Sequence, residues 1–105
     1  MRTFPKSLAA FRKIINERGS RLREIAFDDL RQMTAVPVET VTVGSHSAKI
    51  AVIVEMRQND RLRVVIQGFL KASFLPGDHI ALDGFYKLPD QTVTAMPREE
   101  FYDFG

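Results

Sequence analysis

The chain has 105 residues, of which 45% are apolar and 27% are charged, and its formal net charge is +2. This size and balance are typical of one globular domain with a modest core, and they exclude a disordered chain. Cysteine is absent, which excludes a disulfide framework, a thiolate metal site and a cysteine nucleophile.

The hydropathy of the chain predicts a soluble protein. Its longest apolar run, Ile50 to Val54, is far shorter than the roughly 20 residues that a membrane-spanning helix needs. The N-terminus lacks the apolar stretch and the small-residue cleavage site of a signal peptide. We therefore expect a cytoplasmic protein that has no membrane partner.

The first predicted element is an amphipathic helix over residues 5–18. The spacings of its apolar stripe are four, three and four residues, as expected for one face of a helix. The stripe consists of Phe4, Leu8, Phe11 and Ile15. Gly19 is suited to the C-terminal cap. Beyond it we favour an extended stretch over 20–26 and a short helix over 27–34, although one continuous helix over 20–34 also fits the apolar spacing.

From residue 38 the apolar period changes to two, which predicts antiparallel strands. The expected strands cover residues 38–43, 48–56, 61–69 and 79–83, followed by a hairpin over 85–96. We expect a turn at Pro76-Gly77 before the fourth strand. The last hairpin would turn at Pro89-Asp90 and bring Tyr86 beside Val93.

A three-residue loop over 58–60 would give the second and third strands a favourable register. Its apolar pairs are Met56 with Leu62, Val54 with Val64, and Val52 with Ile66. On the other face Glu55 would lie opposite Arg63. A two-residue loop would set Met56 against Arg63 and lose the apolar pairs, so we favour the first register.

The helices precede the strands along the chain, and this segregation predicts an α+β fold. We expect a single domain with helical residues 1–36, an antiparallel meander of about five strands over 38–96, and a short terminal helix over 97–104. The N-terminal helix and the second short helix would pack on the sheet, with the first covering one of its faces.

Few residues in this sequence suggest a reaction. His46, expected in the loop GSHS, and His79 have no evident catalytic partner. Asp83 would share a strand face with His79 but lie about 13 Å from it. The glycines form no nucleotide-binding motif. We therefore predict no catalytic residue, metal or cofactor, and name only Glu55, His79 and Asp83, with Tyr86 beside them, as candidates for a pocket.

The C-terminal part is rich in aromatic residues. Phe85 and Tyr86 are consecutive in a predicted strand, so they must face opposite sides of the sheet. In the terminal helix Phe101 and Phe104 would share one side, while Tyr102 would point elsewhere. Exposed tyrosine is common at protein interfaces. We therefore predict a partner-binding surface that consists of Phe85, Tyr86, Phe101, Tyr102 and Phe104.

Charge argues against nucleic acid as the partner of this surface. Residues 78–105 carry six acidic and two basic side chains, whereas stacking on nucleic acid needs basic side chains beside the aromatic ones. Residues 1–25 carry seven basic and two acidic side chains, but on an amphipathic helix these usually form the solvated face.

Three functions remain consistent with the sequence. The first is a non-enzymatic protein-binding or accessory module, acting on a partner or as a homo-oligomer. The second is a small enzyme or ligand-binding domain with a pocket between the first helix and the sheet. The third is nucleic-acid binding through the basic N-terminal segment, with Arg12, Lys13 and Arg18 as its contacts. We favour the first because the sequence contains no catalytic constellation.

Overall fold

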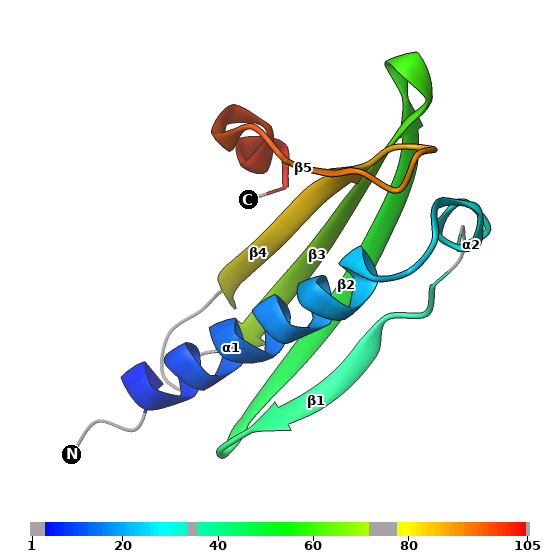
Figure 1. Cartoon of the computed structure of the whole chain (residues 1–105). Helices are drawn as coiled ribbons and strands as arrows, with labels where there is room; N and C mark the ends of the chain where they lie inside the picture. Colours follow the sequence, from blue (N-terminus) through cyan, green and yellow to red (C-terminus); the bar gives the residue numbers. More distant parts are fainter. Residues whose placement is uncertain (1–3, 34–35, 72–77, 105) are drawn as a thin grey trace.

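The computed structural model describes residues 4–33, 36–71 and 78–104, and it has an α+β fold (Figure 1). The elements are α1 (Phe4–Arg23), α2 (Phe27–Arg31), β1 (Glu39–Val43), β2 (His46–Arg57), the 3-10 turn η1 (Gln58–Asp60), β3 (Arg61–Lys71), β4 (Asp78–Lys87), β5 (Val93–Ala95) and the 3-10 helix η2 (Arg98–Asp103). The five strands form one antiparallel meander in the order β1-β2-β3-β4-β5. The predicted fold class is thus confirmed.

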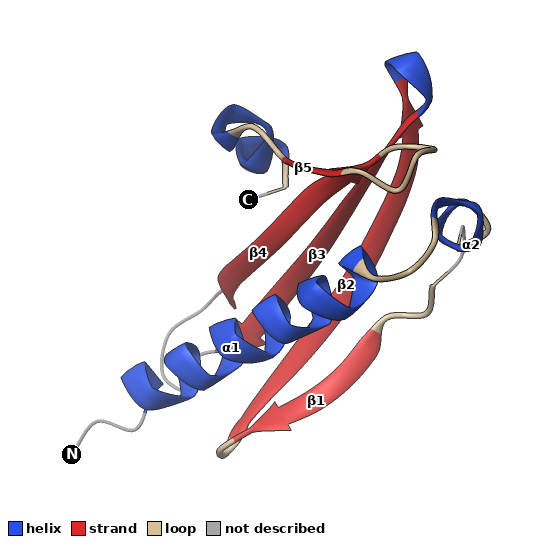
Figure 2. Cartoon of the chain, in the orientation of Figure 1, coloured by secondary structure: helices blue, strands red, loops and turns tan. Residues whose placement is uncertain are grey.

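The helices and the strands form separate layers (Figure 2). Helix α1 packs against β3 and β4, and α2 packs against β2 and β3. Among the described helices none is both long and apolar enough to cross a membrane.

The long hairpin of β2 and β3 has the predicted register. Its pairs include Met56 with Leu62, Val54 with Val64, Val52 with Ile66, and Glu55 with Arg63. The loop at its tip is η1, in which Asn59 and Asp60 have φ values of 62° and 56°. Asparagine and aspartate tolerate this left-handed region better than most side chains, which suits them to so tight a loop.

The main core lies between α1 and the sheet. From the predicted stripe, Phe11 and Ile15 are buried and Leu8 packs against the core, while the side chain of Phe4 lies outside the described part. The sheet contributes Val64, Ile66 and Phe85, each with no exposed surface. The helix approaches β3 closely over Gly68, where an added Cβ would lie 2.6 Å from atoms of both Phe11 and Ile15.

Helix α1 is longer than predicted. It continues through Gly19 to Arg23. The predicted helix cap at Gly19 is therefore wrong, and the predicted extended stretch over 20–26 is wrong for residues 20–23. Two tertiary contacts hold the extra turn: Leu22 is buried in the core, and Arg23 donates hydrogen bonds to both carboxylate oxygens of Asp83, at 2.8 and 3.0 Å. Helix α2 starts at residue 27 as predicted but ends at Arg31.

Gly19 is required by the close approach of α1 to β4. A Cβ on Gly19 would overlap the Asp83 carboxylate and lie 2.8 Å from Nη1 of Arg23. Glycine to alanine inside a helix usually stabilises by about 1 kcal/mol. Here we expect Gly19→Ala to lower the free energy of unfolding by about 1–2 kcal/mol instead, because the methyl group displaces the ion pair.

Urea unfolding of the Gly19→Ala variant checks this expectation. Ser20→Ala, at an exposed position of the same helix, is the matched control and should be neutral or slightly stabilising. In an Asp83→Ala background the Gly19→Ala change should become stabilising, and a loss of similar size there would contradict the explanation.

Four further details differ from the prediction, and two of them concern β4 and its pairing with β5. The expected strand 79–83 and the start of the last hairpin form one strand, β4, and Tyr86 pairs with Thr94 while Lys87 pairs with Val93. The shift arises in the five-residue connection, where the Leu88 amide donates to the Thr92 carbonyl and Gln91 has a φ of 76°. The expected turn at Pro76-Gly77 lies outside the described residues.

The other two differences concern the ends of elements. His46 begins β2 and is buried, because the turn before it uses only two residues and Gly44 adopts a φ of 62°. The predicted terminal helix over 97–104 is the 3-10 helix η2, which begins after Pro97.

Candidate interaction site

The predicted partner-binding aromatics divide into buried and exposed ones. Phe85 faces α1 with no exposed surface, and the guanidinium of Arg23 lies 4.7 Å from its ring centroid. Tyr86 points to the other side of the sheet and is also buried. Phe101 and Phe104 are half-buried against this second face, whereas Tyr102 is 79% exposed. Of the five predicted aromatics, Phe101, Tyr102 and Phe104 therefore keep exposed surface.

The second sheet face has a core of its own. Val65, Tyr86 and Met96 are buried there, and half-buried apolar side chains pack on them from the strands and from η2. Helix η2 thus lies on the sheet face opposite α1. This small core determines where the exposed residues of η2 lie.

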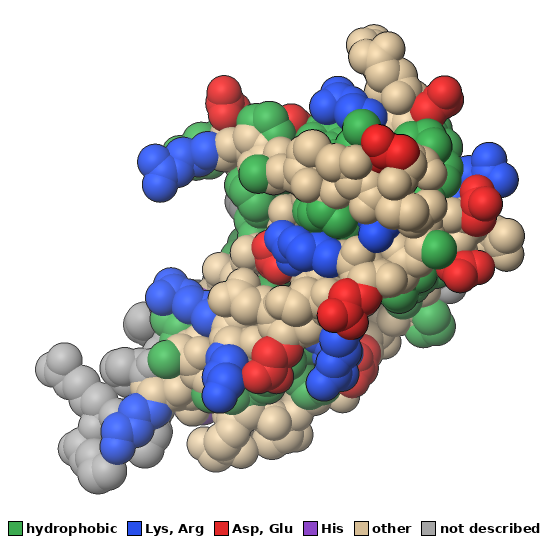
Figure 3. Space-filling view, viewed as in Figure 1, with side chains coloured by type: hydrophobic (Ala, Val, Ile, Leu, Met, Phe, Trp, Pro, Cys, Tyr) green, Lys and Arg blue, Asp and Glu red, His purple; other side chains and the backbone are tan. Residues whose placement is uncertain are grey.

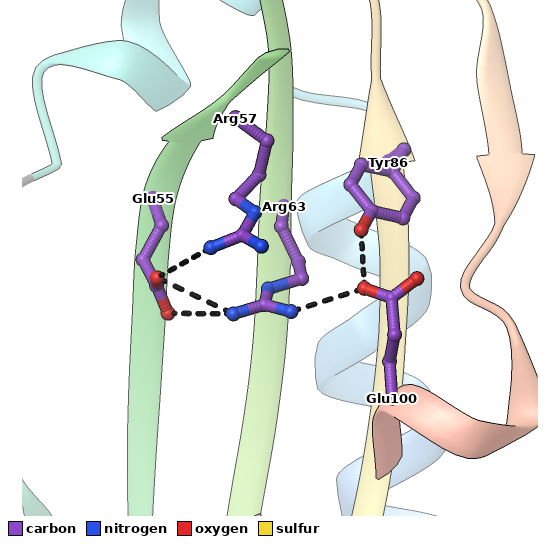
Figure 4. A network of polar contacts seen from close by, with 5 residues as sticks. All are labelled: Glu55, Arg57, Arg63, Tyr86 and Glu100. Atoms are coloured by element: carbon purple, nitrogen blue, oxygen red, sulfur yellow. Dashed lines mark hydrogen bonds and ion pairs between the residues drawn. The ribbon is translucent and has the colours of Figure 1, made fainter. Parts of the chain in front are cut away.

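A polar network fixes η2 on that face (Figure 4). Arg63 is 8% exposed and lies between two carboxylates, with Nη2 3.3 Å from Glu55 Oε2 and Nη1 3.0 Å from Glu100 Oε1. The hydroxyl of Tyr86 donates to Glu100 as well. The Arg63 guanidinium also lies 5.0 Å from the centroid of Phe104. One buried arginine thus connects β2, β3 and η2.

The contacts in this network favour the charged forms of Arg63 and Glu100 and the neutral form of Tyr86. Burial disfavours the charge of Arg63, but its hydrogen bond to Glu100 and the nearby charge of Glu55 raise its pKa overall. The hydrogen bond from Tyr86, followed by that from Arg63, lowers the pKa of Glu100. Burial and the bond to Glu100 raise the pKa of Tyr86, so this phenol stays protonated near neutral pH. The lowered pKa makes the Glu100 carboxylate a weaker base than an ordinary glutamate.

A pocket of about 460 Å³ opens beside the network. Arg57, Arg61 and Arg63 line it together with Glu100 and Asp103, and Arg61 stacks on Tyr86 at 4.4 Å from the ring centroid. With Glu55, three carboxylates balance the three arginines. We therefore interpret these side chains as the attachment of η2. The sequence predicted only the pair of Glu55 and Arg63, because Glu100 reaches them through the tertiary fold alone.

The attachment makes stability depend on pH. Because the folded pKa of Glu100 is lowered, its contribution is present above its unfolded value of about 4.3 and is lost as pH falls through the folded pKa. We expect Glu100→Gln to cost about 1–2 kcal/mol at pH 7, because hydrogen bonds to a charged group contribute about 1.5–3 kcal/mol and glutamine can keep part of this contribution. Urea unfolding from pH 7 to pH 3 should show the two proteins converging in acid.

Glu99→Gln is the control for this pH dependence. Its side chain is exposed and forms no ion pair with another described residue, so it should follow the wild-type curve. A Glu100→Gln variant that loses as much stability in acid as the wild type would contradict the assignment.

The predicted pocket candidates are not brought together. Asp83 faces α1 and is paired with Arg23, whereas Glu55 lies on the opposite sheet face beside Arg63. His79 is exposed on the same strand as Asp83, four residues away. In the described part of the chain, no group of three histidine or acidic side chains could hold a metal ion.

The structure instead reveals a groove beside η2. This η2 groove has a volume of about 380 Å³ and is lined by Ile80, Leu82, Arg98, Phe101 and Tyr102. Ile80 is 39% exposed, and Leu82 and Phe101 are half-buried. The sequence had indicated Phe101 and Tyr102 but not Ile80, Leu82 or Arg98, because these meet them only after η2 folds onto β4.

The edge of β4 is open next to this groove. Strand β5 pairs only with Phe85–Lys87, and no other described strand pairs with the outer side of β4. On the α1 side of the edge lies a second hollow of about 190 Å³, to which Arg12, Ile15 and Asn16 contribute. The space-filling view shows a notch between α1 and the C-terminal segment, with blue basic side chains on both lips and green hydrophobic ones on its upper wall (Figure 3).

Comparison of the chain with models of protein families, with curated proteins and with solved structures finds no match.

Proposed function

We propose that this protein is a non-enzymatic protein-binding module whose partner occupies the η2 groove. The observation that carries the proposal is Tyr102, which is 79% exposed at the wall of a groove that is otherwise largely apolar. Tyrosine beside apolar side chains is typical of residues that anchor a partner, because it provides a large contact area and a polar tip.

The other predicted aromatics support the groove from below. Phe104 and Tyr86 hold η2 against the sheet through Arg63 and Glu100, and Phe85 belongs to the main core. The contact residues of the proposed site are thus Tyr102, Phe101, Ile80 and Leu82, with Arg98 at the rim. This apolar centre with a charged rim has the anatomy of a transient interface.

Contacts of the described residues weigh against the two alternative functions. Phe11 and Ile15 fill the space between α1 and the sheet, where an enzyme or ligand-binding domain of the predicted kind would need its pocket. Of the basic residues of α1, Arg18 is bound to Glu39 and Arg23 to Asp83. The exposed Arg12 lies at the β4 edge.

Capture from a native lysate tests the proposal by comparing variants. We expect Tyr102→Ser to reduce the amount of specifically bound protein by at least about tenfold, as for an interface hot spot. Val38→Ser is the matched control, because Val38 is 59% exposed but lies outside the groove. Equal retention of all proteins by wild type and Tyr102→Ser would overturn the proposal.

A further inference from the structure

Among the described residues, the part of β4 that precedes Phe85 has no strand paired with its outer side. The amide of Gly84 donates to Oδ1 of Asp83 at 2.9 Å, and its carbonyl accepts from Nη2 of Arg23 at 3.3 Å. Both groups therefore point away from β3. Because the direction of backbone groups alternates along a strand, the amides and carbonyls of Leu82 and Ile80 also point outward, while those of Ala81 point toward β3.

The pair of Arg23 and Asp83 marks where this open edge ends. This pair forms hydrogen bonds with the amide and the carbonyl of Gly84, and β5 pairs with the edge from Phe85 onward. The open part thus offers the outward groups of Ile80 and Leu82, and by the same alternation those of Asp78, where β4 begins. Such groups on a sheet edge are a template for an additional strand.

The side chains around the edge indicate the chemistry of that strand. Ile80 and Leu82 project into the η2 groove, so apolar side chains of an added strand would pack beside them. Arg98 stands in the η2 groove and Arg12 in the hollow on the α1 side. Neither arginine forms an ion pair with another described residue, so Arg12 can pair with carboxylates that face the α1 side.

We propose that the partner binds by strand addition, as an extended acidic segment whose apolar side chains alternate with carboxylates. The segment becomes a sixth strand on the outer edge of β4. Its apolar side chains enter the η2 groove, and its carboxylates face Arg12 on the other side. This mode of binding rests on the proposed protein-binding function and specifies the partner and the contacts.

The recessed position of the edge favours a single segment over a second copy of the chain. The open edge lies between the α1 hollow and the η2 groove (Figure 3). In an edge-to-edge dimer each copy would bring its own α1 and η2 alongside the paired strands. A single extended segment has no such elements and can enter.

Amide hydrogen exchange tests the position of the added strand. The probe is the acetylated and amidated pentapeptide Glu-Val-Glu-Val-Glu. In the free protein we expect fast exchange at Ile80 and Leu82 and slow exchange at Ala81. With the peptide, exchange at Ile80 and Leu82 should slow by at least about tenfold while that at Ala81 changes little.

Modified peptides test the hydrogen bonding and the charge. Only alternate residues of an added strand direct their amides toward β4. Methylation of one set of amides, either those of the valines or those of the glutamates, should therefore abolish binding, whereas methylation of the other set should not. Replacing glutamate by lysine should weaken binding about fivefold or more. The Arg12→Gln variant, changed at an exposed helix position, should reduce that preference for the acidic peptide.

Each remaining outcome counts against the proposal. If both methylated peptides bind, or if neither the acidic nor the basic peptide protects Ile80 and Leu82, strand addition is wrong. The protein-binding function then still stands or falls by the Tyr102→Ser capture. Slow exchange at both residues in the free protein, together with a dimeric native mass, would assign the edge to a second copy instead.

Discussion

Phe11→Ala is expected to lower the free energy of unfolding by about 3–5 kcal/mol, the largest loss for a single substitution in this core. Phe11 has no exposed surface, and it lies over β3 at Gly68. Because Gly68 has no side chain, β3 has none at this position that could fill the space left by the ring. Equilibrium urea unfolding followed by far-ultraviolet circular dichroism measures the loss.

Gly68→Ala tests whether Phe11 and β3 are coupled. Alone it should cost about 1–3 kcal/mol, because the new methyl group would lie 2.6 Å from Cζ of Phe11 and from Cδ1 of Ile15. In the Phe11→Ala background the methyl group enters vacated space, so the double variant should be at least about 1 kcal/mol more stable than additivity gives. Additive losses would show that the helix adjusts independently of β3.

The parts of the fold that the sequence predicted correctly are those determined by neighbours along the chain. The register of β2 and β3 follows from alternating apolar residues and a three-residue loop, and it placed Glu55 opposite Arg63. The opposite directions of Phe85 and Tyr86 follow from strand geometry alone. These features needed no knowledge of distant residues.

The errors occur where distant residues decide. Glycine is the residue type expected at a helix cap, but α1 continues past Gly19 because Asp83 accepts hydrogen bonds from Arg23, sixty residues away along the chain. Local sequence does not contain this contact. The predicted pairing of β4 with β5 was wrong by one residue. The observed connection requires a positive φ at Gln91, a conformation that residue propensities assign to glycine rather than to glutamine.

The candidate site shows the same division. Exposure of Tyr102 could be expected from the spacing within the terminal helix. The groove around it could not, because Ile80 and Leu82 belong to a strand whose outer edge is left open by the short β5. The length of β5 therefore determines how much of the β4 edge is open. Because β5 pairs with only three residues of β4, it does not cover Ile80 and Leu82.

Attachment of η2 to the sheet depends on Arg63, and its loss should be costly for that reason. We expect Arg63→Ala to lower the free energy of unfolding by about 2–3 kcal/mol, below the 3–5 kcal/mol of a fully buried pair. The reduction arises because Glu55 and Glu100 are 37% and 25% exposed and can regain water. Urea unfolding gives the global loss, and exchange of the amides of Phe101 and Phe104 reports whether η2 detaches.

Two matched variants separate the charge of Arg63 from its packing. Arg57→Ala removes an arginine that is 46% exposed and only 3.8 Å from Glu55, so it should change stability by less than about 0.5 kcal/mol. Combining Arg63→Met with Glu55→Gln and Glu100→Gln removes the charges together and should recover most of the loss. If the combined variant remains as unstable as Arg63→Ala, the arginine acts through its hydrogen bonds and its contact with Phe104 rather than by neutralising the two carboxylates. Detachment of η2 would also remove Phe101 and Tyr102 from the groove, so Arg63→Ala should abolish partner binding although Arg63 does not line the η2 groove.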